Sequence, residues 1–183
     1  MSLFDRQQRV CVAVCTPMPM RNGVYDTISV RWHRARQGLR IPTNFNTCEM
    51  LADGLEVGDA RSRTVAQVLT TRPVPEFILW IDYDVLMPPD TLTKLFFRAR
   101  TLPGYDIYCG VYCIKNPNMT EPLIYGELGQ GPIWNWKVGD ILTTESHGVK
   151  SVHSGLTLVR TSCYQKLLEA GLVKGSGDDQ DNF

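Results

Sequence analysis

Long apolar runs are absent from this chain of 183 residues, and none approaches the roughly 20 residues that a helix needs to cross a bilayer. The N-terminal segment MSLFDRQQRV carries charged residues where a signal peptide has its apolar core. The formal net charge is zero, so the chain has no general electrostatic attraction to nucleic acid or to an anionic membrane. We therefore expect one cytoplasmic domain over residues 1–183, with no transmembrane segment and no nucleic-acid partner.

Closely spaced CxxC pairs are also missing, although the chain has six cysteines. Cys11 and Cys15 are four residues apart, as are Cys109 and Cys113, and both pairs lie in strand-like runs. On a strand this spacing puts both thiols on one face, where free cysteine behaves as a small buried apolar residue. The pairs are not the CxxC knuckle of structural zinc sites, so the pattern favours core packing over a zinc site.

Basic residues are concentrated in one segment, RWHRARQGLR, residues 31–40. A solvated helix face is the simpler explanation of this run, and a surface that binds a polyanion is the alternative.

Strand and helix patterns alternate along the chain. Apolar runs predict strands at residues 10–17, 47–51, 77–81, 106–113 and 152–159. Amphipathic spacing predicts helices at residues 59–72, 91–100 and 162–170, after a partly helical segment at 25–36. The expected end signals of these helices are Asp59, Asp90, a capping box of Ser162 with Gln165, and Gly171 as a C-terminal stop. The alternation predicts an α/β fold, a Rossmann-like three-layer sandwich with a mainly parallel central sheet.

Two carboxylates end one of these strands. The run FILWI is followed by Asp82, Tyr83 and Asp84, then by two prolines and an amphipathic helix. Ligands of open α/β sheets bind outside the carboxyl ends of the strands, and a carboxylate there is costly to desolvate unless it is hydrogen-bonded or binds a cation. Mg²⁺ typically takes one or two carboxylates together with phosphate oxygens. The segment therefore predicts a site for a metal and a diphosphate. The simpler alternative is that Asp84 begins a turn and Asp82 caps a nearby element.

The segment IDYDVLMPPDTLTKL resembles the DxD segment of GT-A-fold glycosyltransferases, particularly the family 2-like enzymes. Four other segments are similar to the family in matching order: VCVAVCTPMP, VGDARSRTVAQVL, SVHSGLTLVRTSCYQKL and GDDQDNF. Ser62 stands where the family usually has Asn, and Asp178 stands where it usually has Glu. The acidic segment is the last matched one, so we expect a single GT-A-like domain in which the C-terminal part of the usual fold is missing.

The resemblance implies transfer of a sugar from a UDP- or GDP-sugar donor to an acceptor hydroxyl, with Mn²⁺ or Mg²⁺ as cofactor. The residues that it places at the donor are Thr16, Pro17, Arg61, Asp82, Tyr83 and Asp84. It makes Asp82 and Asp84 metal ligands, with His153 as a substitute for the downstream histidine of the family. Asp178 or Asp179 would be the catalytic base, and Ser154 and Gly155 would lie near the acceptor and the donor sugar.

Four of these assignments have plain structural alternatives. His153 fits a histidine packed or hydrogen-bonded at the start of a strand equally well. Asp53 is a candidate for hydrogen bonding to the nucleobase, but an Asp-Gly turn explains it as well. Trp134 and Trp136 alternate, so on a strand they would share a face that contacts either a sugar or the core. The acids at residues 178–181 fit either a catalytic segment or a solvated tail.

Two other functions compete with glycosyl transfer. A nucleotidyltransferase of similar fold would also use paired acids, but CTPMPMRNG offers only Arg21 and one glycine for the basic loop that most of these enzymes carry. The second alternative is a non-catalytic domain that binds a nucleotide-sugar or a glycan. Metal-dependent binding without turnover would distinguish it from an enzyme.

Overall fold

A computed structural model describes residues 8–16, 30–53, 57–83, 85–111, 124–125, 151–152 and 155–171. Among these residues, no helix combines the length and the apolar character needed to cross a membrane.

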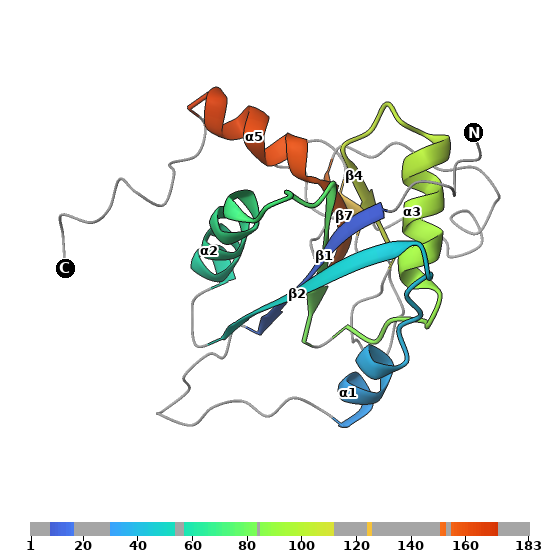
Figure 1. The fold of residues 1–183 in the computed structure, drawn as a ribbon. Coiled ribbons are helices and arrows are strands. Elements are labelled where there is room, and N and C mark those ends of the chain that lie inside the picture. Colours follow the sequence, from blue (N-terminus) through green and yellow to red (C-terminus); the bar gives the residue numbers. More distant parts are fainter. Residues whose placement is uncertain are drawn as a thin grey trace.

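A five-stranded sheet forms the middle of the molecule (Figure 1). Its strands lie in the order β2 (Phe45–Asp53), β1 (Gln8–Thr16), β3 (Phe77–Asp82), β7 (Leu156–Arg160) and β4 (Ile107–Cys109). The first three are parallel, whereas β7 is antiparallel to both of its neighbours, β3 and β4. The sheet is therefore mixed, with one reversed strand inside it, and the α/β class predicted from the sequence is confirmed. A separate antiparallel pair consists of β5 (Ile124–Tyr125) and β6 (Ser151–Val152).

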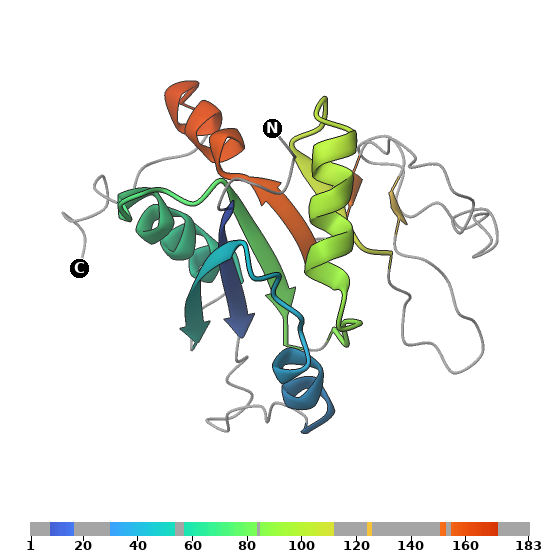
Figure 2. The same ribbon diagram turned by 45° about the vertical axis from the view of Figure 1, so that its right-hand side comes forward.

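Helices cover both faces of the sheet (Figures 1 and 2). On one face lie α1 (Val30–Gln37) and α3 (Thr91–Thr101), and on the other lie α2 (Val57–Thr70) and α5 (Thr161–Glu169). Successive residues of β3 alternate between the two layers, as strand geometry requires. Phe77, Leu79 and Ile81 pack in the α1/α3 layer, and Ile78 and Trp80 pack in the α2/α5 layer. Because both faces of this strand are buried, its sequence is a continuous apolar run.

Two predicted strands differ from the observed ones. The run at 152–159 is not one strand, because β6 ends at Val152 and β7 begins at Leu156 after a turn that contains Gly155. The strand predicted at 106–113 is only β4, which ends at Cys109. In the antiparallel pair, Cys109 lies opposite Thr157, and β7 begins at Leu156. A residue of β4 beyond Gly110 would therefore have no residue of β7 opposite it.

The helix starts differ from the predicted caps. Asp59 lies in the first turn of α2 rather than before it. Asp90 precedes α3 but makes no side-chain cap; its carboxylate pairs with Lys94 at 2.9 Å, and the hydrogen bond from Lys94 lowers the pKa of Asp90. Ser162 lies inside α5, so the expected capping box is wrong. Gly171 is confirmed as the C-terminal stop, since its φ of 67° is one that glycine adopts readily.

Core packing is confirmed for Cys11, whereas the Cys15 side chain and Cys113 lie outside what the structure describes. Cys11 is fully buried, and burial raises the pKa of its thiol far above the ordinary value. Cys109 is partly buried, and burial also raises its thiol pKa. Both thiols therefore stay protonated and act as apolar groups.

Candidate functional site at the carboxyl edge of the sheet

The carboxyl ends of three parallel strands bring together residues that are far apart in the sequence. The strand register pairs Cys15 of β1 with Asp82 of β3, and Thr16 of β1 with Asp53 of β2. Thr16, Asp53 and Asp82, all expected at the donor, therefore lie along one edge of the sheet. The sheet extends from β1 to β2 on one side and from β3 to β7 and β4 on the other. The edge between β1 and β3 is thus the point where strand order reverses, the usual place for a ligand in such sheets.

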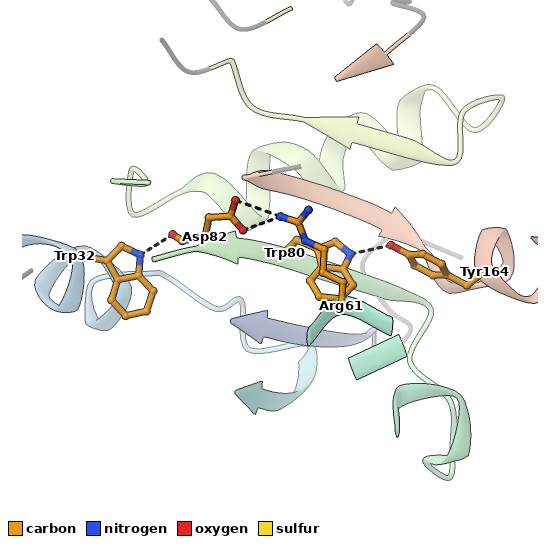
Figure 3. A network of polar contacts seen from close by, with 5 residues as sticks. All are labelled: Trp32, Arg61, Trp80, Asp82 and Tyr164. Atoms are coloured by element: carbon orange, nitrogen blue, oxygen red, sulfur yellow. Dashed lines mark hydrogen bonds and ion pairs between the residues drawn. The ribbon is translucent and has the colours of Figure 1, made fainter. Parts of the chain in front are cut away.

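Asp82 forms an ion pair with Arg61 of α2 (Figure 3). The Nη2 atom of Arg61 donates to both carboxylate oxygens of Asp82, at 2.9 Å and 3.2 Å. Asp82 belongs to the same alternating set as Ile78 and Trp80, so its side chain points toward the α2 layer. Both side chains remain partly exposed, Arg61 by 24% and Asp82 by 17%. The site therefore presents one anion and one cation to solvent, side by side.

Trp32 of α1 holds the backbone of Asp82 from the opposite layer. Its indole Nε1 donates to the Asp82 carbonyl oxygen at 2.8 Å, and the side chain is buried. The same oxygen accepts a second hydrogen bond from the Val85 backbone N–H. This contact fixes α1 beside the end of β3, as Figure 2 also shows.

Trp32 is not among the predicted site residues, because the charge of the segment 31–40 favours a solvated helix face. Arg31, Arg34 and Arg40 are indeed exposed, as expected for a solvated face. Arg36 forms an ion pair with Glu49 of β2. The signal that was available is the large aromatic residue in an otherwise polar helix, since a tryptophan there is expected to bury its ring and donate its N–H.

Gly155 contacts Asp82 directly. Its carbonyl oxygen accepts a hydrogen bond from the Asp82 backbone N–H at 2.8 Å, so the start of β7 lies against the end of β3. Tyr83 is partly buried and packs in the α1/α3 layer, on the side of the sheet opposite Arg61. Gly155 therefore lies against the backbone of Asp82, whereas Tyr83 faces away from the ion pair.

A second tryptophan, on β3, is hydrogen-bonded within the α2/α5 layer. The Nε1 atom of Trp80 donates to the Tyr164 hydroxyl of α5 at 2.9 Å (Figure 3). Because Trp80 is only 2% exposed, this bond satisfies an N–H that would otherwise be buried without a partner.

The remaining predicted site residues lie outside the described residues: Pro17, Asp84, Trp134, Trp136, His153, Ser154, Asp178 and Asp179. Two of the three expected metal ligands are in this set. In the part of the chain that is described, no group of three or more His, Cys, Asp or Glu side chains is arranged to hold a metal ion.

The Asp82 carboxylate is chemically suited to a cation even with Arg61 beside it. A carboxylate offers about four lone-pair sites, and the single Arg61 nitrogen uses one on each oxygen. Mg²⁺ is commonly held by one or two carboxylates, with phosphate oxygens and water completing the shell. Asp82 fits the role of one such carboxylate.

Comparison with known proteins gives a likeness in fold only. No family model matches the chain, and no curated protein matches it either. Among solved structures, the chain is similar to the crystal structure of A197 from STIV, with a TM-score of 0.50 and 15% sequence identity. The similarity covers 85% of this chain and 67% of that one. It supports the α/β architecture and carries no information on function.

Proposed function

We propose that the chain is a metal-dependent glycosyltransferase domain with a GT-A-like, family 2-like fold. It would transfer a sugar from a UDP- or GDP-sugar to an acceptor hydroxyl in the cytoplasm. The observation that supports this most is the Arg61–Asp82 pair at the carboxyl edge between β1 and β3. A partly exposed cation and anion at this edge match the two charges of a metal–diphosphate ligand.

The chemistry requires that negative charge be stabilised as the nucleoside diphosphate leaves. The Arg61 guanidinium lies at this edge beside Asp82, where it can donate hydrogen bonds and supply positive charge to a phosphate oxygen. Asp82 and, from the sequence, Asp84 would hold Mn²⁺ or Mg²⁺, which when bound neutralises charge on the leaving group. Thr16 and Asp53, whose backbones pair at the ends of β1 and β2, are the proposed contacts of the nucleoside.

The proposed acceptor site rests mainly on the sequence resemblance. The hydrogen bond between the Gly155 carbonyl and the Asp82 N–H supports an acceptor site near the donor edge. Ser154, His153 and the two tryptophans of GPIWNWKVG remain candidates for contacts with the sugar. Asp178 or Asp179 remains the proposed base that takes the proton of the acceptor hydroxyl.

Calorimetric titration with UDP and GDP, with and without Mn²⁺, tests the donor site. We expect one nucleotide to bind the wild-type chain only when Mn²⁺ is present, and the Asp82→Ala, Asp84→Ala double variant to lose this binding. The control is a double variant with Asp106→Ala and Glu169→Ala, which removes the same amount of charge. Asp106 precedes β4 and Glu169 ends α5, near the amino edge of the sheet. This variant should bind the nucleotide normally. Absence of binding by the folded wild-type chain would refute the donor site.

Turnover then separates the three candidate functions. Release of UDP or GDP from the corresponding nucleotide-sugar, faster with a sugar acceptor, supports a glycosyltransferase. Release of pyrophosphate from a nucleoside triphosphate in the presence of a sugar phosphate indicates the nucleotidyltransferase instead. Metal-dependent binding with neither reaction indicates the non-catalytic binding domain.

A further inference from the structure

The geometry of the Arg61–Asp82 pair favours exchange of partners. Both contacts originate from Nη2 of Arg61, so one nitrogen serves both carboxylate oxygens. The stronger arrangement of these groups is a fork in which two guanidinium nitrogens each meet one oxygen. Arg61 does not adopt it, and its Nη1 has no hydrogen-bond partner among the described residues. Each group therefore keeps unused hydrogen-bonding positions: other N–H groups on Arg61 and further lone pairs on Asp82.

Position distinguishes this pair from other arginine contacts of the protein. The buried Nε of Arg61 has no partner among the described residues, but the same is true of Arg36 and Arg100, so that feature alone marks no site. Arg100, which bonds Gln8 and Glu76, lies at the amino edge of the sheet, where β1 begins and β3 is about to begin. Among the ion pairs of the described residues, the Arg61 pair alone involves the last residue of β3, at the edge where strand order reverses.

We propose that Arg61 and Asp82 form an ion-exchange latch: they neutralise each other in the free protein and are separated by a divalent cation and a diphosphate, which bind Asp82 and Arg61 respectively. The latch deepens the proposed function and rests on it for the diphosphate as the anion. A cation that binds alone must weaken the ion pair and leave Arg61 with an uncompensated charge. A diphosphate that binds alone leaves Asp82 in the same state. When both bind, each protein charge exchanges one partner for another, so neither is left unpaired.

The latch and a simple binding role for Arg61 predict different changes in cation affinity when Arg61 is removed. If Arg61 only assisted binding of the anion, its removal would weaken binding of the diphosphate and leave the affinity for the cation unchanged. In the latch, Arg61 competes with the cation for Asp82. Its removal should therefore strengthen binding of the cation alone and weaken binding of the diphosphate alone. Removal of the Asp82 charge should do the reverse, because it releases Arg61.

The experiment uses the full chain, Mn²⁺ and inorganic pyrophosphate as separate probes. Mn²⁺ binding is followed by water proton relaxation, and pyrophosphate binding without metal by calorimetry. For Arg61→Gln we expect Mn²⁺ to bind about fivefold more tightly than to wild type, the effect of removing one competing ion pair that is partly exposed. For Asp82→Asn, which keeps the side-chain shape, we expect pyrophosphate to bind about fivefold more tightly.

Matched controls separate the latch from a change in net charge. Arg63→Gln removes an exposed arginine from α2, two residues from Arg61, and Asp59→Asn removes an exposed acid from the first turn of the same helix. Neither should change the affinity for Mn²⁺ or pyrophosphate by as much as twofold, because charges exposed to solvent are well screened. Equal effects in the controls and in the pair variants overturn the latch.

The outcomes for the latch and for the proposed function can be told apart. Unchanged or weaker Mn²⁺ binding by folded Arg61→Gln overturns the latch, as does unchanged or weaker pyrophosphate binding by folded Asp82→Asn. If Arg61→Gln does not fold, the isosteric Asp82→Asn variant decides alone. If both variants respond as expected but wild type binds neither UDP nor GDP with Mn²⁺, the latch stands and the donor site fails. If a nucleotide binds and the variants shift the other way, the donor site stands and the latch fails.

Discussion

Asp82 is held by its backbone as much as by its side chain. Its N–H donates to Gly155, and its carbonyl accepts from the indole of Trp32 and from Val85. These partners come from α1, from the start of β7 and from the segment that follows β3. The direction of the carboxylate is therefore set by contacts from three parts of the chain, and Arg61 then meets a group that is already oriented.

At the residue scale, Trp32→Phe should disturb the ligand site through this backbone contact. The substitution keeps an aromatic ring but removes the N–H that bonds the Asp82 carbonyl at 2.8 Å. We expect the free energy of unfolding to fall by about 1–2 kcal/mol, the usual effect of losing a buried hydrogen bond. We also expect Mn²⁺-dependent nucleotide binding to weaken severalfold, because the end of β3 is less well fixed. Urea denaturation and calorimetry measure the two effects.

Trp80→Phe is the matched control, since it removes the comparable indole bond to Tyr164 at 2.9 Å without touching Asp82. It should lower stability to a similar extent and leave nucleotide affinity unchanged. A positioning role for Trp32 is excluded if both variants bind the nucleotide equally well.

At the element scale, the sequence predicts what depends on local periodicity. Leu92, Leu95, Phe96 and Ala99 recur at helical spacing, and all four are buried in α3. The ends of β1 and β3 were likewise anticipated, because continuous apolar runs stop where the strands leave the core. The position of Asp82 at a strand end was predictable for the same reason.

Contacts between distant elements were not predictable in this way. The antiparallel direction of β7 depends on its pairing with β3 and β4, which no local sequence pattern predicts. Trp32 and Asp82 are separated by 50 positions, so their hydrogen bond follows from how α1 packs and not from its own sequence. Arg61 was identified by resemblance to a family, and its pairing with Asp82 became visible only in the structure.

Arg160 gives a testable case of such a long-range contact, because it joins β7 to α3. Its Nη2 donates to the Ala99 carbonyl in the last turn of α3 at 2.8 Å, and its guanidinium lies 4.9 Å from the centroid of the Phe77 ring. Arg160→Met keeps the apolar stem but loses the charge and the hydrogen bonds. We expect the free energy of unfolding to fall by about 1–3 kcal/mol, measured by urea denaturation.

The control for this variant is Lys94→Met. Lys94 lies in α3, and the substitution breaks its exposed ion pair with Asp90, which precedes the helix. It should cost less than about 0.5 kcal/mol, as isolated surface pairs do. Equal losses in the two variants would mean that Arg160 contributes no more than a surface charge.

At the scale of the whole molecule, the sheet makes the two helical layers depend on each other. Neighbouring residues of β3 enter opposite layers: Leu79 packs with α1 and α3, and Ile78 packs with α2 and α5. Both side chains are fully buried. A strand that loses support on one face also loses the backbone order on which the other face depends. We therefore expect the described core to unfold as one cooperative unit.

Leu79→Ala and Ile78→Ala test this coupling. Each should lower the free energy of unfolding by about 2–5 kcal/mol, because each leaves a cavity in a packed layer. Far-UV circular dichroism and tryptophan fluorescence should give coincident urea transitions for both variants, since the two layers unfold together. Ile107→Ala, at a position that is 49% exposed on the edge strand β4, should cost much less. If the two probes gave different transition midpoints in either variant, the layers would unfold independently. The ligand site between the layers would then be stabilised by one layer alone.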